Sequence, residues 1–347
     1  MKYKKIYIIL SLILIILPKQ TLPFESKTID LAIKKFEQKN SKSSVLIINS
    51  RTAKVEYVYN RDFAYSRRFP PGSIAKLWSA VIFIENSAMF DFDRHRHLNC
   101  RGKFFAKGKF RFGEIDDITF NLPIDKKTKK RYGKCALRDG HGDVDLEKAL
   151  VQSCNVYFLT NASNNPEKFY DLLIKKWHLN ENANAGLSAT GDGTLIISRP
   201  KSVFMYISSS IGEGGVIRVS PLKVAQTYAA FFENTPLLVP HEGNTNAKIQ
   251  YSLNISFSHR DFIKGALSRV HTEGTLKEMS IKNGDINILC AKTGTATHLK
   301  KRLTTHGWNV VYFRLKNINY VMVTFVFKGS GMKEAGKLSE TVLNLLK

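Results

Sequence analysis

The chain has 347 residues, of which 43% are hydrophobic, so it can bury the core of one large domain or two small ones. Lys and Arg number 53 against 29 Asp and Glu, and the formal net charge of +24 favours an anionic partner or surface. The basic residues are spread along the chain, without zinc-finger spacing, an aromatic RNA-recognition motif or a basic helix, so no nucleic-acid partner is expected. We interpret the charge as a solvated cationic surface near an acidic polymer or membrane. A compositional bias of the source organism would produce the same charge.

The amino terminus has the pattern of an export signal. The basic stretch MKYKK is followed by an apolar run over residues 6–17 and then by Pro18. Because a bilayer span needs about 20 apolar residues, this shorter run is typical of a secretory signal. No small-x-small cleavage site follows, so residues 1–26 are expected to be either a signal peptide or a signal anchor. The protein is therefore expected in the periplasm or on the outer face of the cytoplasmic membrane, where residues 6–17 could anchor it.

The first half of the chain predicts a strand pair, a buried helix and a polar segment. Residues 44–50 and 54–60 read as two strands around a short turn, and a strongly apolar helix follows from Ser73. Residues 91–140 are polar, basic and turn-rich, with a hairpin expected at 105–114. We interpret 91–140 as an insertion over the core.

The second half predicts helices and then strands. Residues 144–162 have helical apolar spacing with one interruption at Ser153, and 166–180 and 220–233 are also expected to be helical. Three runs rich in β-branched and aromatic residues, 286–297, 306–315 and 320–328, precede a helix at 335–346. Strands at both ends of the chain imply one sheet that gathers both termini. The fold class is therefore α/β, with helices covering the sheet and a mainly helical second lobe.

The four cysteines fall into two pairs by context. Cys100 and Cys135 lie in a polar, glycine-containing segment and are a candidate disulfide in an exported protein. Cys154 and Cys290 lie in apolar contexts and are expected to be small buried residues.

A metal site is a competing interpretation of the same segment. Its ligands would come from His95, His97, Cys100, Cys135 and His141. Their spacings match no zinc pattern, so we expect no metal and no cofactor.

The stretch PPGSIAKLW places Ser73 after a Pro-Pro-Gly turn and three residues before Lys76. Ser73 could cap the helix, or it could be a nucleophile with Lys76 as its base, because a helix brings positions i and i+3 onto one face. Ser-x-x-Lys also begins at Ser198, Ser220 and Ser330, and Ser220 reads as a helix cap followed by proline. Only Ser73 opens a helix that is apolar nearly all round, where a lysine must be paired or deprotonated. We expect Ser73 both to start the helix and to be the attacking group.

Two further motifs carry candidate site residues. Ser153 and Asn155, in a loop between two helical stretches, can face one cavity while Cys154 points into the protein. The unique Lys-Thr-Gly places Lys292 in a strand-like run, where a second cation would favour a neutral Lys76. Strict alternation puts Gly294 on the same strand face as Lys292.

The residues that follow Lys292 pose a geometric problem. Thr293 and Thr295 lie on the other face of the strand from Lys292, so a twisted edge strand or a bulge is needed if all three are to bind one ligand. Gly294 would let a substrate backbone approach closely.

In this order, SIAK, SCN and KTGT resemble the signature of penicillin-binding proteins and serine β-lactamases, and the chain resembles a penicillin-binding transpeptidase domain. The flanks FPPGSIAKLWSAVIFIE, HGDVDLEKALVQSCNVYF and HGWNVVYF extend the resemblance, as does 211–232. The resemblance covers residues 27–347 and implies an antiparallel sheet covered by helices, with a mainly helical second lobe.

The resemblance implies roles for the motif residues. Ser73 would be the acyl-forming nucleophile and Lys76 its base, and Ser153 and Asn155 would assist proton transfer and hold the peptide. The catalytic set would thus be Ser73, Lys76, Ser153, Asn155 and Lys292. Lys292, Thr293, Gly294 and Thr295 would bind the substrate, and the backbone N–H groups of Ser73 and Thr295 would form an oxyanion hole.

The implied function is a peptidoglycan D,D-transpeptidase that takes D-Ala-D-Ala stem peptides and is trapped by β-lactams. A D,D-carboxypeptidase, a β-lactamase or a β-lactam sensor would need the same nucleophile and lysine, so these functions are alternatives. A further alternative, from a different functional class, is a cationic binding protein that has no enzymatic activity. Only residues 1–26 precede the resemblance, so we expect a separate glycosyltransferase partner.

Overall fold

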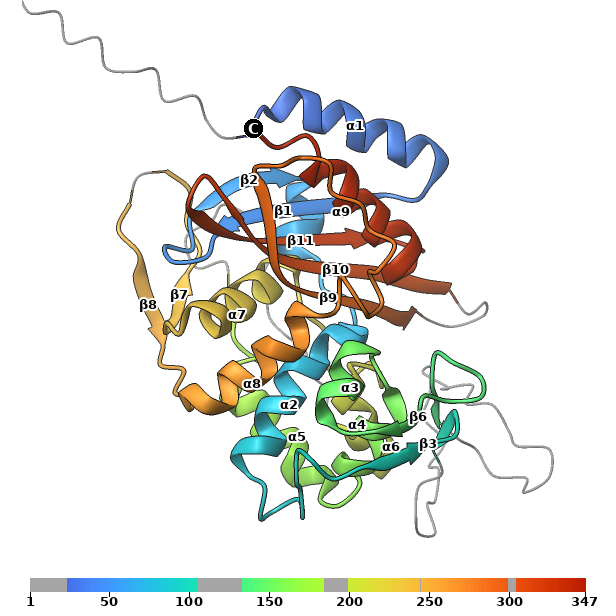
Figure 1. The fold of residues 1–347 in the computed structure, drawn as a ribbon. Helices are drawn as coiled ribbons and strands as arrows, with labels where there is room; N and C mark the ends of the chain where they lie inside the picture. The colour runs from blue at the N-terminus through green and yellow to red at the C-terminus, as the bar shows by residue number, and fades with distance from the viewer. Residues whose placement is uncertain (1–23, 105–132, 184–198, 244, 299–303) are drawn as a thin grey trace, which may run out of the picture.

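The computed structural model describes residues 24–104, 133–183, 199–243, 245–298 and 304–347 (Figure 1). The apolar run at 6–17 and the hairpin expected at 105–114 lie outside the described residues. Within these ranges, no helix combines the length and the apolar character that a membrane crossing needs.

One five-stranded sheet gathers both ends of the chain, in the spatial order β2-β1-β11-β10-β9 (Figure 1). All neighbouring strands are antiparallel. Lys316 and Asn317 both have positive φ, 46° and 65°, as a two-residue hairpin turn between β10 and β11 requires. The predicted α/β fold with an antiparallel sheet is therefore confirmed. The strands are β1 Ser43–Asn49, β2 Val55–Tyr59, β9 Ile286–His298, β10 Thr304–Leu315 and β11 Ile318–Val326.

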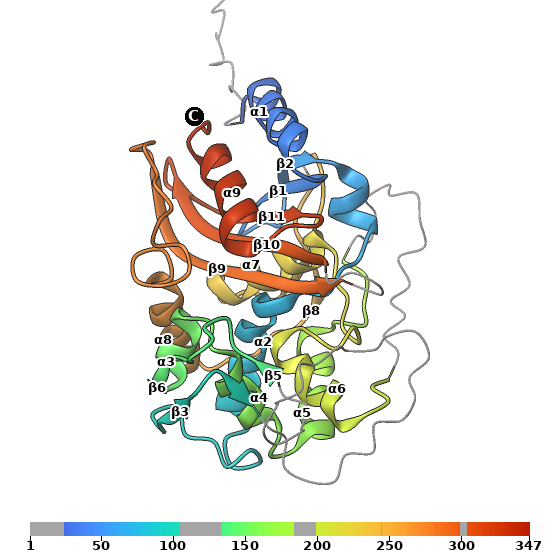
Figure 2. The same cartoon turned by 90° about the vertical axis from the view of Figure 1, so that its right-hand side faces the viewer.

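The two faces of the sheet are covered by different helices (Figure 2). Helices α1 (Ser26–Lys39) and α9 (Gly336–Leu343) pack on the face to which Val45 and Val311 belong. Successive residues of a strand point to opposite faces, so Leu46 belongs to the other core.

The other face packs on helices that lead into the second lobe. These are α2 Ala75–Glu85, α7 Pro221–Glu233 and α8 Phe257–Ser268. Every residue of α2 from Ala75 to Ile84 is buried, because α2 lies between the sheet and the helices of the second lobe (Figure 1). The expected apolar helix in the middle of the molecule is present.

In the part of the chain that the structure describes, the second lobe combines four α-helices with two small ribbons. The helices are α3 Leu146–Val151, α4 Asn155–Ala162, α5 Pro166–Trp177 and α6 Val203–Ser208. The ribbons pair β3 Leu98–Cys100 with β6 Gly142–Val144, and β4 Lys103–Phe104 with β5 Gly133–Lys134. A further ribbon of β7 Leu237–Val239 and β8 Lys248–Tyr251 lies beside α7. The described parts of 91–140 thus form short strands that flank the α3–α4 junction (Figure 1).

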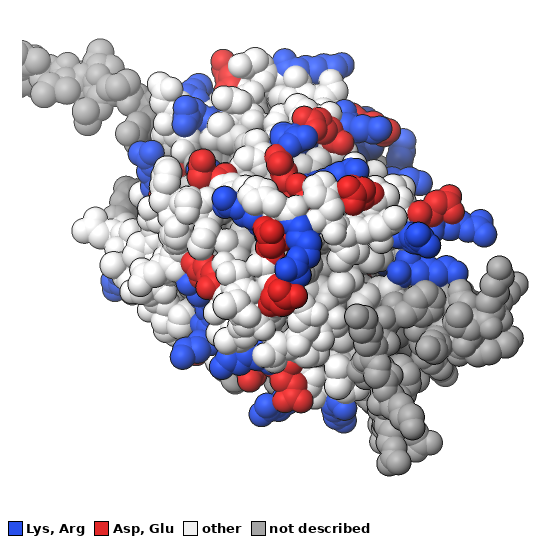
Figure 3. All heavy atoms as spheres, turned by 60° about the horizontal axis from the view of Figure 1, so that its bottom comes forward, with Lys and Arg blue, Asp and Glu red and all other residues white. Residues whose placement is uncertain are grey.

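The surface carries charges of both signs. On the face shown in Figure 3, Lys and Arg side chains are interspersed with Asp and Glu. The Lys and Arg side chains of the described residues in this view do not gather into a single patch.

Candidate active site

Ser73 lies in a short 3-10 turn, Gly72–Ile74, which leads directly into α2. Gly72 has φ +56°, and a Cβ at this position would lie 2.6 Å from the Thr295 carbonyl oxygen. A side chain is therefore excluded there, and the chain runs against strand β9 immediately before Ser73.

Three hydrogen bonds fix this turn to other elements. The Trp308 indole N–H donates to the Pro70 carbonyl (2.9 Å), and the Tyr228 hydroxyl donates to the Ile74 carbonyl (2.7 Å). The Gly72 N–H donates to the Gly212 carbonyl at 3.1 Å. Ser73 is thus held from the sheet, from α7 and from the segment after α6, which leaves its backbone little freedom.

The side chain of Ser73 does not cap the helix. Ile74 occupies the N-cap of α2 and no side chain makes a capping hydrogen bond, which corrects the expectation that Ser73 starts α2 as its cap. Ser73 lies one residue too early, inside the 3-10 turn. Its half-buried hydroxyl has no hydrogen-bond partner among the described residues, so it remains free to react.

Lys76 is fully buried one helical turn after Ser73. Its Nζ donates to the Ser153 carbonyl (2.6 Å), the Ser153 Oγ (3.1 Å) and the Asn155 Oδ1 (2.7 Å). Lys76 therefore joins α2 to the second motif.

Ser153 is where the three motifs meet. It has φ +58° in the three-residue connection between α3 and α4, a conformation that non-glycine residues rarely adopt. Its Oγ accepts from both Lys76 Nζ at 3.1 Å and Lys292 Nζ at 2.8 Å. One hydroxyl thus bridges two lysines that come from different elements, helix α2 and strand β9.

Both lysines are shifted toward the neutral form. Burial lowers the pKa of Lys76 to about 8, although nearby thiols act in the opposite direction. Burial lowers the pKa of Lys292 well below its ordinary value, and the Lys76 cation lowers it further. A neutral amine is therefore accessible near physiological pH, as a general base requires.

Successive side chains of strand β9 point to opposite faces of the sheet, as the alternation of residues along a strand predicted. Lys292 points to Ser153, and a Cβ at Gly294 would lie 2.9 Å from the Pro71 carbonyl oxygen, on the side of the Ser73 turn. Thr293 Oγ1 instead contacts Thr275 Oγ1 at 2.7 Å.

The edge position of β9 exposes its backbone. The register of β9 against β10 is continuous from Ala291 to His298, and the bulge lies earlier, at Cys290 and Ile288. The Thr297 N–H donates outward to Glu213 Oε1 at 3.0 Å. Because alternate N–H groups of a strand point the same way, the Thr295 N–H also leaves the free edge of β9, on the side of Gly72. An edge strand, and no local bulge, thus brings Thr295 beside Ser73.

Glu213 is a titratable residue at this edge to which the sequence gave no role. It also accepts a hydrogen bond from Thr297 Oγ1 at 3.4 Å. Desolvation raises its pKa to about 8, partly offset by the bonds from Thr297. The sequence feature that could have indicated Glu213 is its glycine-rich context, Gly-Glu-Gly-Gly. In the structure, Gly212 of this stretch packs against Gly72.

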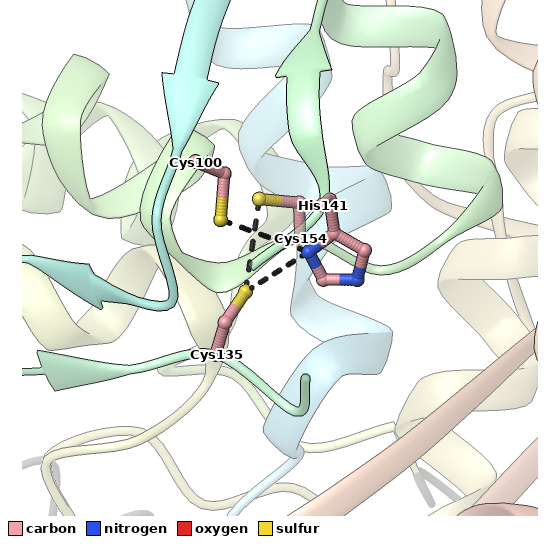
Figure 4. Close-up of side chains that lie close together, drawn as sticks. All are labelled: Cys100, Cys135, His141 and Cys154. Atoms are coloured by element: carbon pink, nitrogen blue, oxygen red, sulfur yellow. Dashed lines mark hydrogen bonds between the residues drawn. The ribbon is translucent and has the colours of Figure 1, made fainter. Parts of the chain in front are cut away.

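The cysteines are arranged differently from the expected pairing. All four are free thiols, so Cys100 and Cys135 form no disulfide in the structure. Instead Cys100, Cys135 and Cys154 surround His141, and the four ligand atoms lie within 4.8 Å of one another (Figure 4). We call these four residues the Cys/His cluster.

Two histidines of the metal site considered from the sequence lie elsewhere. His97 Nδ1 pairs with Asp143 Oδ2 at 2.7 Å, and the His95 ring packs against Phe262. Spacing along the chain did not indicate Cys154, because it contributes from a helix junction remote in sequence.

The fold is shared with solved penicillin-binding proteins. The transpeptidase domain of penicillin-binding protein 3 from Burkholderia pseudomallei has 17% identity and a TM-score of 0.67, and the match covers 93% of each chain. Penicillin-binding protein 2 from Helicobacter pylori has 16% identity and a TM-score of 0.71, with 92% of this chain and 62% of that chain covered. The chain also spans 60% of a chain from a peptidoglycan synthase complex, with 16% identity. Comparison with curated protein sequences gives no match.

A family model described as the penicillin-binding protein transpeptidase domain matches residues 107–346. This range includes Ser153, Asn155 and Lys292, whereas Ser73 and Lys76 precede it. The structure joins Lys76 to Ser153 and Asn155, and Ser153 to Lys292. The model matches well over half of the sequence, so the chain belongs to the penicillin-binding protein transpeptidase family.

Proposed function

We propose that this protein is a serine D,D-transpeptidase that forms an acyl-enzyme on Ser73 from D-Ala-D-Ala stem peptides and cross-links peptidoglycan. The observation that carries the proposal is the contact of one hydroxyl, Ser153 Oγ, with two buried lysines behind an unpaired Ser73. Serine nucleophiles require an adjacent base, and burial lowers the pKa of Lys76 to about 8, so that its neutral form is accessible.

Acylation would begin with proton transfer from the Ser73 hydroxyl to neutral Lys76 as Oγ attacks the carbonyl carbon of the penultimate D-Ala. The oxyanion that forms would accept hydrogen bonds from the N–H groups of Ser73 and Thr295. Collapse then breaks the amide bond, and the proton held by Lys76 passes through Ser153 to the departing D-Ala amine. Ser73 is left as an ester.

Deacylation would reverse the proton path with a new nucleophile. A stem-peptide amine attacks the ester carbonyl and loses a proton toward Ser153 and Lys76, and Ser73 leaves as the alcohol. Water in place of the amine makes the same enzyme a carboxypeptidase. Asn155, held by its own bond to the Lys134 carbonyl at 2.9 Å, would orient the peptide.

The terminal carboxylate would bind at β9. Burial lowers the pKa of Lys292, and a bound carboxylate would favour its protonated form there, while Gly294 leaves space for a substrate backbone. The Thr295 hydroxyl accepts from the Gly331 N–H at 2.9 Å, so its own proton is available to donate to a carboxylate. The Thr293 hydroxyl would have to break its hydrogen bond with Thr275 before it could donate to the carboxylate. A β-lactam carboxylate would occupy the same position.

Location and partners follow from the same proposal. Export through residues 1–26 would place the domain in the periplasm or at the outer face of the membrane, next to its polymer. One similar solved structure is a peptidoglycan synthase complex that coordinates polymerization and crosslinking, and another is a complex of Helicobacter pylori PBP2 with MreC. We propose that a separate glycosyltransferase supplies the glycan strands here.

Labelled penicillin on the purified protein tests this function. A transpeptidase is expected to give a long-lived adduct on Ser73, and a synthetic D-Ala-D-Ala peptide should release D-Ala and yield a cross-linked product when an acceptor amine is added. Rapid loss of the label would identify a β-lactamase instead. Absence of any adduct would leave a cationic binding protein that has kept the fold.

A further inference from the structure

We propose that the Cys/His cluster is a structural zinc site, with Cys100, Cys135 and Cys154 as thiolate ligands and His141 Nδ1 as the fourth ligand (Figure 4). Three sulfurs and one imidazole nitrogen are a common ligand set of closed, tetrahedral zinc sites. The proposal concerns a site beside the catalytic residues and does not rest on the proposed reaction.

The distances within the cluster fit ligands around one ion. Zinc bonds of about 2.3 Å to sulfur and about 2.0 Å to nitrogen place tetrahedral ligands about 3.5–3.8 Å apart. Cys135 Sγ lies 3.7 Å from Cys154 Sγ and 3.3 Å from His141 Nδ1, and Cys100 Sγ lies 3.7 Å from the same nitrogen. The side chains converge from four directions on one point (Figure 4).

A disulfide explains this arrangement less well. Bonded sulfurs are about 2.0 Å apart, and pairing any two of the three thiols leaves the third buried beside them. The three cysteines of the cluster are all buried, and His141 is half-buried. A zinc ion uses all four side chains at once, and leaves no buried thiol without a partner.

The ligands join elements that cannot be stable alone. Cys100 ends β3 and His141 precedes β6, whereas Cys135 follows β5 and Cys154 is the N-cap of α4. The β4–β5 ribbon has two residues in each strand, too few for independent stability. A metal that links both ribbons to the α3–α4 junction would supply the missing stability.

The cluster is also built into the second catalytic motif. Cys154 lies between Ser153 and Asn155, and the Asn155 N–H donates to Cys135 Sγ at 3.1 Å. Such an N–H to sulfur bond is typical of the groups that orient metal ligands. Zinc would therefore hold the strained Ser153 backbone, with φ +58°, in the position where Lys76 and Lys292 contact it.

Metal analysis of the full-length protein tests the site directly. We expect about one equivalent of zinc per chain after dialysis against a weak chelator, and none in Cys135→Ser or His141→Ala. Cys290→Ser is the matched control, because Cys290 is also a buried free thiol, but among the described residues its Sγ bonds to the Lys264 carbonyl alone, at 3.6 Å. This control should retain the full equivalent.

Cobalt substitution keeps the proposal falsifiable if the ligand variants fold poorly. Protein stripped of metal and refilled with Co²⁺ should show the intense visible bands of tetrahedral cobalt and a thiolate charge-transfer band. Its thermal midpoint should also rise on refilling with zinc. Metal-free protein with unchanged stability on adding zinc, or with two of its four thiols joined in a disulfide by thiol titration, would overturn the site.

Discussion

Two Ser-x-x-Lys segments of this chain can be compared directly, because both begin a helix and both bury their lysine. Ser220 Oγ accepts a hydrogen bond from the Lys223 N–H at 3.2 Å and caps α7, as the sequence predicted. Ser73 caps nothing and keeps its hydroxyl free. The two serines therefore have the same spacing to lysine but opposite side-chain roles.

The two lysines differ in what surrounds them. Burial lowers the pKa of both, to about 8 for Lys76 and about 7 for Lys223. Within the described ranges, Lys223 Nζ bonds to Gln226 Oε1 of its own helix alone, at 3.1 Å, whereas Lys76 reaches the second motif and lies near Lys292. A depressed lysine pKa thus reports burial at both sites, and only the convergence of motifs marks one of them as a candidate catalytic centre.

The largest difference is expected between alanine variants of the two serines, Ser73 and Ser220. Ser73→Ala should abolish the covalent penicillin adduct completely, because the acylated oxygen is gone. Ser220→Ala should retain the adduct and lower the free energy of unfolding by about 1 kcal/mol through loss of the cap. Gel fluorescence and chemical denaturation measure the two quantities, and an adduct on Ser73→Ala would place the nucleophile elsewhere.

The next effect separates the two lysines. Lys76→Met should slow acylation by roughly 10²–10⁴-fold, because the proposed base is removed while the buried volume is largely kept. Lys223→Met should change the rate by no more than about twofold, since Lys223 Nζ bonds to Gln226 of its own helix and no described contact links it to Lys76, Ser153 or Lys292. Stopped-flow acylation rates compare them. Equal losses in both variants would mean that the rate reports general folding damage.

The smallest effect is in the pH dependence. Acylation should accelerate as pH rises through about 8, because Lys76 must lose its proton to act as a base, and Lys223→Met should keep this profile. The pH dependence of the free energy of unfolding should instead reflect the protonation of Lys223. Its pKa is about 7 when folded and near 10.5 when unfolded, so the unfolded chain binds more protons between these values.

The sign follows from that proton difference. The free energy of unfolding of the wild type should rise relative to Lys223→Met as pH increases from about 7 toward 10. Parallel denaturation curves for the two proteins at each pH test this. A constant difference across the range would contradict a buried, neutralised Lys223.

Much of the fold could be predicted because the hydrophobic periodicity and the turn-forming residues indicate the same element boundaries in this chain. The runs that predicted strands became β1, β2, β9, β10 and β11 within a residue or two at most ends, and the interruption at Ser153 separates α3 from α4. The helix expected at 166–180 ends at Trp177, because His178 adopts a left-handed conformation as its cap. Such local features depend on neighbours in sequence.

The candidate site was predicted only in part. Spacing and resemblance selected Ser73, Lys76, Ser153, Asn155 and Lys292, but not the free hydroxyl, since helix starts after serine usually mean a cap. The Thr295 N–H points away from the sheet because β9 is an edge strand. The sequence of one segment does not show that its strand will lie at the edge. Glu213 joins the site through its hydrogen bonds from Thr297, at the same free edge of β9.

By itself, the sequence determined which segments become strands and helices and which short motifs carry reactive groups, because both depend on residue type and local period. Only the tertiary structure decided that one serine hydroxyl meets two lysines, from α2 and from β9, and that three cysteines and a histidine lie together. Cys100 and His141 are 41 residues apart and Ser153 and Lys292 are 139 apart. Contacts over such separations depend on how whole elements pack, because no local pattern can specify which remote side chains fill the same space.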